Sequence, residues 1–322
     1  MTPMVSVVVP TYKRPLSLSR CLDGLTSQEM PPHSYEVLVV DDADSEETRR
    51  VVGNWAGRSS IVIRYQLAGP AHGPAAARNA GWRAAHGSII AFTHDDCIPE
   101  SRWLKEGLAA LAEDVSLVKG RVIRPVPIRP TDYELNAAQS EKAEFATANC
   151  FCRKSALEAV GGFDEQFTRA SREDSDLFFS LLKQGARVVE APQSVVIHPV
   201  RPATWGVSLR LQKNNFFEAL LYKKHRNLYR QRIRPAHPWS FYAMMGLLVV
   251  SPVLSASRHP RAAVACLGIW ALLTGQFFVK RLYLTTHRFK DVFEMLVTSI
   301  LIPPVALYWR LRGAVHYRVW FV

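Results

Sequence analysis

Acidic residues are nearly absent from the last third of this 322-residue chain. Only three Asp or Glu fall after residue 204, against 17 Lys and Arg, whereas residues 1–204 hold 25 acids and 23 bases. The net charge of +12 therefore lies in the last third, where basic clusters alternate with uncharged apolar runs. A basic chain can bind nucleic acid, but basic clusters between apolar runs favour a membrane with anionic headgroups. We therefore expect membrane lipids as partners and no nucleic acid.

Cysteine is also scarce. The chain has five, namely Cys21, Cys97, Cys150, Cys152 and Cys266. They are odd in number and scattered, and the Cys-x-Cys at 150–152 has no second pair to complete a zinc site. This argues against a disulfide framework and fits free thiols in the cytosol. A secretory signal peptide is not expected either, because the apolar run at residues 4–10 is too short.

The first 200 residues alternate apolar, β-branched runs with helical patterns. Residues 5–10, 35–40 and 61–66 read as strands, and the alanine-rich stretch 74–86 reads as a helix. Strands that alternate with helices indicate βαβ units. The pattern therefore predicts an α/β domain with a mostly parallel sheet and flanking helices.

Adjacent carboxylates end two of the predicted strands. Asp95 and Asp96 follow the apolar run that begins at Ser88, and Asp41 and Asp42 follow the predicted strand at residues 35–40. Open α/β sheets bind ligands at the carboxyl edge of their strands. Two neighbouring carboxylates repel each other unless a cation lies between them, and such hard ligands suit Mg²⁺ or Mn²⁺. An isolated Asp-Asp would be a solvated turn, but acids on two strands predict a nucleotide-diphosphate and metal site.

The motifs of residues 7–198, taken together, resemble the family 2 glycosyltransferases of the GT-A fold. They are Val-Val-Val-Pro-Thr-Tyr-Lys-Arg (7–14), Val-Val-Asp-Asp (39–42), Ala-Ala-Arg-Asn-Ala-Gly (76–81), Thr-His-Asp-Asp (93–96), Thr-Ala-Asn-Cys-Phe-Cys-Arg-Lys-Ser-Ala-Leu (147–157), Gly-Gly-Phe-Asp-Glu (161–165), Arg-Glu-Asp-Ser-Asp-Leu (172–177) and His198. Each motif alone is weak, but all of them occur in the family's order. The resemblance implies a GT-A catalytic domain, Rossmann-like with flanking helices, over residues 1–204.

The resemblance also implies which residues bind the nucleotide-sugar donor. Pro10, Thr11 and Arg14 would lie in the loop that packs on the nucleotide. Asp41 would accept a hydrogen bond from the base, and Arg78 would approach the base or the phosphates. For Asp41 and Arg78 the simpler interpretation is a salt bridge within a loop.

Three further acids and one histidine complete the implied site. Asp95 would hold the ribose, Asp96 would bind the metal, and His198 would add a second metal ligand unless it is only a satisfied histidine at a strand end. Asp174 would be the general base that takes a proton from the acceptor hydroxyl during an inverting displacement. The helix dipole alone would also explain acids at this helix start.

Two positions depart from the family pattern. His94 stands where many relatives have a third acid, so it is either a spectator or a contact of the metal. The Gln-x-x-Arg-Trp motif of processive synthases is absent, since residues 212–216 read Gln-Lys-Asn-Asn-Phe. Transfer of a single sugar is therefore the better interpretation.

The last third predicts a membrane region. Residues 205–234 have the pattern of a basic amphipathic helix in the headgroup plane, or of a helix packed on the catalytic domain. Residues 235–322 follow, with uncharged runs at about 239–257 and 262–279 that predict two spans. The run 295–309 is short and contains Pro303-Pro304, which predicts a broken, re-entrant or interfacial segment.

The sequence thus predicts an inverting, metal-dependent glycosyltransferase at the cytoplasmic membrane, with its catalytic domain facing the cytosol. It would use a nucleotide-sugar donor and a glycan or lipid-linked acceptor, in cell-surface glycan or glycolipid synthesis. Two alternatives remain: a catalytically inactive, membrane-tethered nucleotide-binding protein, and a nucleotidyltransferase. The latter needs a glycine- and lysine-rich phosphate loop, which residues 10–14 are not.

Overall fold

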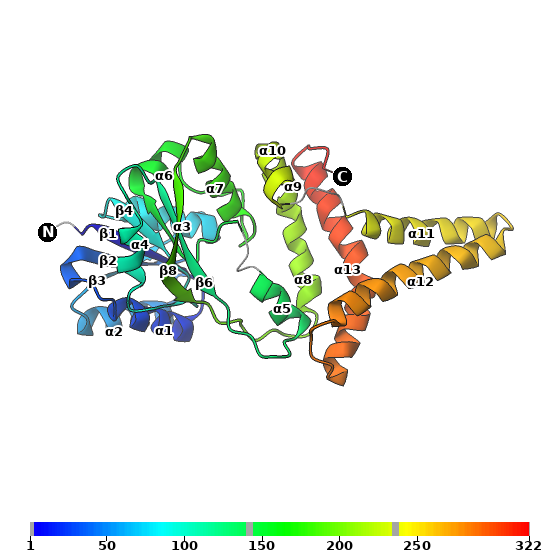
Figure 1. Cartoon of the computed structure of the whole chain (residues 1–322), viewed down its shortest axis with the longest axis horizontal. Helices are drawn as coiled ribbons and strands as arrows, with labels where there is room; N and C mark the ends of the chain where they lie inside the picture. The colour runs from blue at the N-terminus through cyan, green and yellow to red at the C-terminus, as the bar shows by residue number, and fades with distance from the viewer. Residues whose placement is uncertain (1–2, 140–143, 234–237, 322) are drawn as a thin grey trace. The chain divides into compact units, whose positions relative to one another are not determined.

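The computed structural model describes residues 3–139, 144–233 and 238–321 (Figure 1). The chain forms two compact units, one of Met1–Pro125 and Ser140–Pro199, the other of Val126–Gln139 and Val200–Val322. The first ends at Pro199, before the predicted boundary at residue 204. The sequence did not anticipate that Val126–Gln139 belongs to the second unit. The predicted boundary at residues 234–235 lies outside the described residues.

The first unit is built on an eight-stranded sheet with the order β3-β2-β1-β4-β7-β6-β8-β5. The strands are β1 Val5–Thr11, β2 Tyr35–Asp41, β3 Val62–Leu67, β4 Ile89–Phe92, β5 Ile98–Pro99, β6 Leu117–Ile123, β7 Cys150–Arg153 and β8 Val188–Ile197. The β3-β2-β1-β4 half is parallel, as predicted, whereas β7 pairs antiparallel with both β4 and β6. The fold class is α/β with a mixed sheet.

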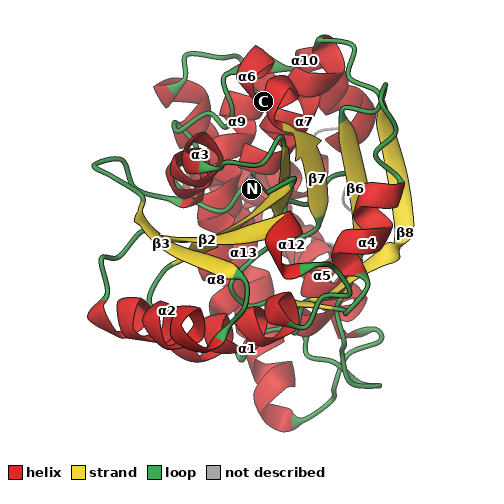
Figure 2. Cartoon of the chain, turned by 90° about the vertical axis from the view of Figure 1, so that its left-hand side faces the viewer, coloured by secondary structure: helices red, strands yellow, loops and turns green. Residues whose placement is uncertain are grey.

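Helices cover both faces of this sheet. They are α1 Pro15–Thr26, α2 Glu46–Arg58, α3 Pro74–Ala84, α4 Trp103–Ala109, α6 Lys154–Val160 and α7 Glu173–Lys183, with a short 3-10 turn at Pro32–Ser34. Figure 2 shows α1 and α2 on one side of the parallel strands and α3 on the other. Because successive strand residues point to opposite faces, the alternate residues Val5, Val7 and Val9 of β1 all enter one core.

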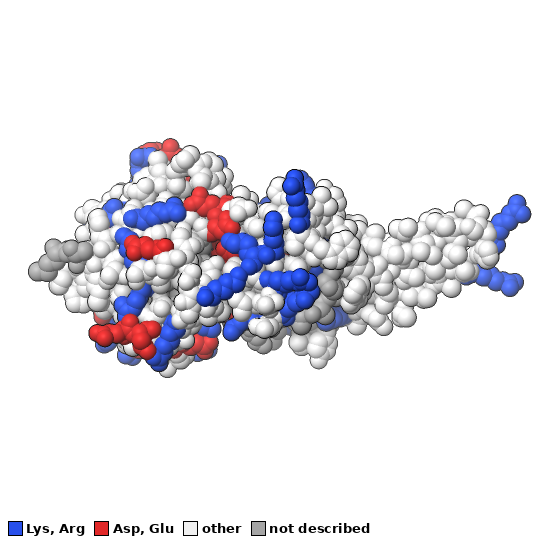
Figure 3. Space-filling model, turned by 90° about the horizontal axis from the view of Figure 1, so that it is seen from above, with Lys and Arg blue, Asp and Glu red and all other residues white. Residues whose placement is uncertain are grey.

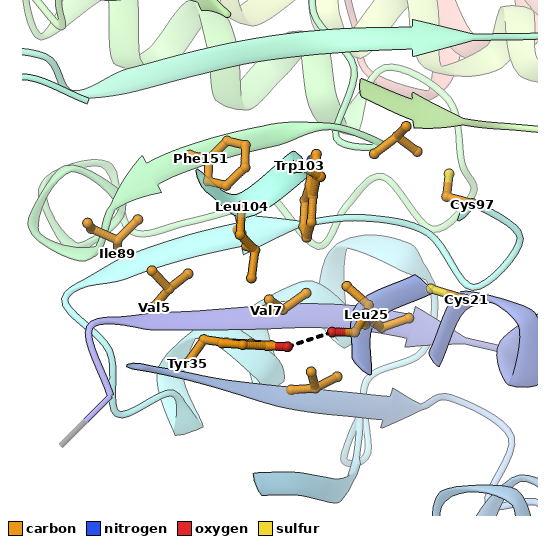
Figure 4. Packing of buried hydrophobic residues seen from close by; sticks show 14 of the residues in the cluster. Val5, Val7, Cys21, Leu25, Tyr35, Ile89, Cys97, Trp103, Leu104 and Phe151 are labelled. Atoms are coloured by element: carbon orange, nitrogen blue, oxygen red, sulfur yellow. Dashed lines mark hydrogen bonds between the residues drawn. The ribbon is translucent and has the colours of Figure 1, made fainter. Parts of the chain in front are cut away.

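That core joins α1, the parallel strands and α4 (Figure 4). Trp103 and Phe151 are fully buried, with ring centroids 5.2 Å apart. The Tyr35 hydroxyl donates a 2.7 Å hydrogen bond to the carbonyl of Leu25, so the polar end of a buried ring is satisfied. The packing fixes where β1, β2 and β4 end, and therefore fixes the edge of the sheet that carries the acids.

The second unit is helical. Its helices are α5 Asp132–Gln139, α8 Val207–Leu211, α9 Asn215–Lys224, α10 Arg226–Leu228, α11 Trp239–Ala256, α12 Pro260–Leu282 and α13 Phe289–His316, with a 3-10 turn at Gln212–Asn214 and a π-turn at Tyr229–Ile233. Asp132 of α5 pairs with Arg281 of α12, with 2.7 Å between Oδ2 and Nη2, and both side chains are about nine-tenths buried. This ion pair anchors the segment Val126–Gln139 to α12.

Two expectations for this unit were wrong. Residues 205–233 do not form one amphipathic helix, because the 3-10 turn and His225 divide them, and the apolar face of α9 is buried against α13. The run at 295–309 is not broken either, since α13 continues through Pro303 and Pro304. Proline keeps a helical φ, but it removes an N–H donor and its ring crowds the carbonyl four residues earlier. Burial of Ile302, Pro303 and Ala306 offsets that loss.

Three helices, α11, α12 and α13, are long and apolar enough to cross a membrane by length and composition. The apolar windows of α11 and α12 are 11% buried, whereas that of α13 is 39% buried. Viewed from above, the α11–α12 hairpin has an uncharged surface along its length and basic residues at its tip, where Arg258 and Arg261 lie (Figure 3). The hairpin therefore exposes apolar surface of the kind that lipid covers.

Candidate active site

The carboxyl ends of β1 and β4 meet at Asp95. The carboxylate of Asp95 accepts hydrogen bonds from Thr11 Oγ1 at 2.8 Å and from Arg14 Nη1 at 3.0 Å. It is 2% exposed, and burial raises its pKa although Arg14 opposes the shift. Thr11 and Arg14 are more than 80 positions from Asp95 in the sequence, and the parallel pairing of β1 with β4 brings them together. The expected donor loop and the strand-end acids therefore lie at the same edge of the sheet.

Asp96 lies beside His198, with 3.1 Å between Asp96 Oδ1 and His198 Nε2. The antiparallel pairing of β5 with β8 explains this contact, because Ile98 stands opposite Ile197 in the register. The backbone N–H of His198 also donates to the carbonyl of Ile123 at 2.8 Å, which fixes the end of β8. Both side chains are buried.

A group of four possible metal ligands surrounds this contact. One donor atom each from His94, Asp96, Cys97 and His198 lie within 4.8 Å of one another. His198 Nδ1 is buried and has no hydrogen-bond partner among the residues described. The thiol of Cys97 is a soft ligand, which Mg²⁺ and Mn²⁺ do not prefer. Asp96 and His198 are the pair that fits a divalent cation.

His94 already has a partner for one ring nitrogen. Arg78 Nη2 lies 3.1 Å from His94 Nε2, and since a guanidinium can only donate, Nε2 must be the acceptor. Burial, with the nearby Arg78 and His198, lowers the pKa of His94 well below its usual value. The ring is therefore neutral, and only Nδ1 remains for a metal.

The third group of acids lies at the start of α7. Glu173 and Asp176 are 3% and 2% exposed, whereas Asp174 is partly exposed. The backbone N–H of Ser175 donates to Asp174 Oδ1 at 2.8 Å. Burial raises the pKa of Asp174, and Arg78 opposes that shift. Of these three acids, Asp174 alone is accessible enough to meet a substrate hydroxyl.

Arg78 lies on α3 and is 2% exposed. Its Nη1 donates to Glu173 Oε1 at 3.1 Å while Nη2 reaches His94. Arg78 was expected near the base or phosphates of a donor, or in a loop salt bridge. It forms an ion pair with Glu173, which links two helices and not the ends of a loop, and its other nitrogen reaches the turn after β4. Contact with a donor stays a prediction.

Asp41 ends β2, and β1 lies between β2 and β4, the strand that precedes Asp95. Its carboxylate accepts hydrogen bonds from Ala43 N at 3.0 Å, Ser45 N at 2.7 Å and Tyr65 Oη at 3.0 Å. The register pairs it with Thr11, and Pro10 lies half-buried just before. The expected base-binding acid is thus held by the loop that follows it and by Tyr65 of β3, at the same edge of the sheet.

Two motif residues prove to be scaffolds of the site. Asn79 exchanges hydrogen bonds with the backbone of Phe163, accepting from its N–H at 2.9 Å and donating to its carbonyl at 2.8 Å. Asn149 accepts from Trp103 Nε1 and donates to the carbonyls of Arg121 and Ser194. Both residues lie in motifs of the sequence, but no role was expected for either. For Asn149, a polar amide directly before the apolar strand β7 was the available signal.

Comparison with known proteins gives consistent matches. The family model described as Glycosyl transferase family 2 matches residues 6–160, and that described as Glycosyl transferase family group 2 matches residues 131–310. Glycosyltransferase AglE of Haloferax volcanii is 29% identical over 213 residues, which are 62% of this chain and 68% of that protein.

Other curated relatives are longer. Validoxylamine A glucosyltransferase of Streptomyces hygroscopicus subsp. limoneus is 28% identical over 230 residues, 60% of this chain and 51% of the relative. Pre-mycofactocin glycosyltransferase of Mycobacterium tuberculosis is 31% identical over 217 residues, 61% of this chain and 43% of the relative. The chain thus spans about half the length of these two proteins.

Among solved structures, the chain is similar to a mannosyltransferase from Pyrobaculum calidifontis in complex with GDP-Man and Mn²⁺. The TM-score is 0.55 at 21% identity, covering 98% of this chain and 85% of that one. At this identity the likeness concerns the fold, and it confirms the predicted fold class.

Proposed function

Because this chain belongs to the family 2 glycosyltransferases, we propose that it transfers one sugar, with inversion, from a nucleoside-diphosphate sugar to an acceptor hydroxyl at a membrane surface. The observation that carries the proposal is the convergence of three groups within one unit. These are the Thr11–Arg14–Asp95 cluster, the Asp96–His198 pair and the start of α7 with the partly exposed Asp174. Arg78 joins the third group to the first two, because it contacts both Glu173 and His94.

The first group would hold the donor. Asp95 is already oriented by Thr11 and Arg14, so its carboxylate needs little reordering to accept the ribose hydroxyls. Arg14 is about one-third exposed and is able to reach a phosphate. Pro10 and Asp41 lie at the ends of β1 and β2, at the same edge of the sheet, and would contact the nucleotide. The relatives' names support sugar transfer, and the solved complex with GDP-Man supports a nucleotide-sugar donor.

Asp174 would act as the base. Its carboxylate would take the proton of the acceptor hydroxyl while that oxygen forms a bond to the anomeric carbon. The bond from this carbon to the phosphate oxygen breaks, and the nucleoside diphosphate leaves with the electron pair. Attack and departure on opposite faces invert the anomeric configuration. The raised pKa of Asp174 makes it a stronger base than a solvated carboxylate.

Asp96 and His198 would hold a divalent cation, Mg²⁺ or Mn²⁺. When bound, such an ion neutralises the charge that develops on the leaving diphosphate. The contribution of the chain is to keep both ligands buried and 3.1 Å apart, so that little rearrangement is needed. The neutral ring of His94 lies beside them and adds no positive charge.

The second unit would place the reaction at the membrane. We propose that α11 and α12 cross it and that α13 lies in the interface, with the first unit and the carboxyl terminus in the cytosol. α13 runs across the direction of the α11–α12 hairpin (Figure 1), and one of its faces is buried on α9. Its other face exposes Phe289, Phe293 and Leu296. Flanking Lys and Arg favour the cytosolic side. A lipid-linked or membrane-proximal glycan is the acceptor that this arrangement favours.

The test is release of nucleoside diphosphate from a panel of nucleotide sugars by the purified full chain in lipid nanodiscs. We expect turnover with one donor class, loss of turnover in EDTA and recovery with Mn²⁺ or Mg²⁺. Asp96→Ala should abolish turnover, and His198→Ala should weaken metal affinity by about 10-fold or more. Undiminished turnover in excess EDTA would contradict the metal site. No release from any donor would contradict the function itself.

A further inference from the structure

A buried arginine connects two parts of the candidate site that the proposed mechanism treats separately. Arg78, on the second turn of α3, contacts Glu173 at the start of α7 and His94 in the turn after β4. All three side chains belong to the first unit, and Arg78 and Glu173 are 2% and 3% exposed. The guanidinium thus spans from the residue before the proposed base to the turn that carries Asp95 and Asp96.

We propose that Arg78 is a positioning residue for the transfer reaction: it holds the start of α7, and with it Asp174, against the strand-end turn without contacting the donor. The inference rests on the proposed function, because it takes Asp174 as the base. It differs from the expectation drawn from the sequence, in which Arg78 approaches the base or the phosphates of the donor.

The geometry of the guanidinium supports this role. One terminal nitrogen is used by Glu173 at 3.1 Å and the other by His94 at 3.1 Å, while the Phe163 ring covers the group, 5.4 Å from its centroid. A side chain that is 2% exposed and has both terminal nitrogens engaged would have to break one of these contacts to reach a phosphate. Lysine, a point charge, could not make both contacts at once.

The electrostatics support it as well. Asp174 has Glu173 beside it on α7, Arg172 before it and Arg78 facing it from α3, and Cys150 of β7 lies near enough to feel its charge. Burial raises the pKa of Asp174 and of Glu173, and Arg78 opposes both shifts. The buried cation of Arg78 therefore lowers the pKa of both carboxyl groups and favours the ionised form of Asp174 that can act as a base.

The two substitutions should differ in their pH effects. Arg78→Met removes the cation, so the pKa of Asp174 rises and the acidic limb of the kcat profile moves up by about one pH unit or more. Burial and the charge of Asp174 raise the pKa of Glu173 to about 7, so Glu173 is protonated over most of this limb and Glu173→Gln should move the limb much less. Because neither change touches the donor, the donor Kd should stay within about 3-fold of the wild-type value while kcat of Arg78→Met falls by about 10-fold or more.

Two further variants keep the test decisive. Arg78→Met leaves Glu173 buried without its partner and could unfold the chain. The double variant Arg78→Met/Glu173→Gln removes the buried pair without leaving a carboxyl group that lacks its partner, and we expect it to fold, to bind donor and to keep the raised acidic limb of Arg78→Met. Arg83→Met is the matched control, because Arg83 lies on the same helix with an exposed side chain and a surface ion pair.

The experiment combines calorimetric donor binding with kcat and KM between pH 5 and 9 on the full chain in nanodiscs, followed by thermal unfolding of each variant. A donor Kd that weakens by about 10-fold or more in Arg78→Met, with an unmoved acidic limb in that variant, would place Arg78 on the donor and overturn the inference. Wild-type turnover in the same assay separates that outcome from failure of the proposed function.

Discussion

Replacing Asp174 by Asn is expected to remove most of the transfer activity while leaving donor binding intact. The substitution changes one oxygen into an amide nitrogen and keeps the shape of the side chain. The oxygen that accepts the hydrogen bond from Ser175 N at 2.8 Å can be retained, so the start of α7 keeps its local structure. What the amide cannot do is accept the acceptor's proton.

The size of the effect follows from the role of a general base. A positioned base contributes about 10²- to 10⁴-fold. Each factor of ten corresponds to about 1.4 kcal/mol of activation free energy, so the barrier should rise by about 3 to 5 kcal/mol. The loss should appear in kcat, because the proton moves only during the displacement. Arg78 then faces Glu173 alone, and the buried cation keeps one carboxylate partner.

The assay is steady-state release of nucleoside diphosphate, with donor affinity from calorimetry and stability from thermal unfolding. Wild-type stability and donor Kd with kcat reduced by about 100-fold or more would support the assignment. Loss of donor affinity would make Asp174 a structural residue. A kcat within about 10-fold of wild type would move the base to another group, although Glu173 and Asp176 are almost completely buried.

Three further predictions concern the fold and the membrane. Glu36 is buried and accepts hydrogen bonds from Ser6, Arg64 and the backbone of His86. Burial raises the pKa of Glu36, but the hydrogen bonds and Arg64 have the larger combined effect, so the pKa is lowered overall. Glu36→Gln should therefore lower the free energy of unfolding by about 1–3 kcal/mol at pH 7, as measured by denaturant unfolding. This loss should shrink as the pH falls below about 4, and a loss that stays constant with pH would refute the prediction. Gly81→Ala should destabilise the protein by about 1–3 kcal/mol, because the new Cβ would lie 2.4 Å from Val8 Cγ1. Gly53→Ala on α2 is the control, and it should be neutral or stabilising because the position has open space around it. Equal effects of the two substitutions would contradict the packing argument. A reporter active only outside the cytosol, fused after the last residue, should give no signal, and a strong signal would mean that α13 crosses the membrane.

The amino-acid sequence by itself determined the elements and the fold class. The β-branched runs at 5–10, 35–40 and 61–66 each lie within one residue of the strand boundaries found, because local alternation and turn residues decide where such strands begin and end. The apolar run that ends at Asp95 and the helical stripe after Asp174 were equally local signals. So were the uncharged runs that became α11 and α12.

Tertiary structure decided which of these residues meet. His198 reaches Asp96 only because β5 pairs antiparallel with β8, a register that no local pattern encodes. Arg78 turned toward Glu173 and His94 because a buried guanidinium needs partners, and α3 places those two within reach.

The same reason explains the errors in the second unit. Pro303-Pro304 would end an isolated helix, yet packing of α13 on α9 stabilises the helix beyond them. The segment Val126–Gln139 belongs to the second unit although the chain on both sides of it belongs to the first. Its Asp132 pairs with Arg281 of α12, 149 positions later in the chain. Such contacts depend on burial and charge pairing between distant residues, and these exist only once the chain has folded.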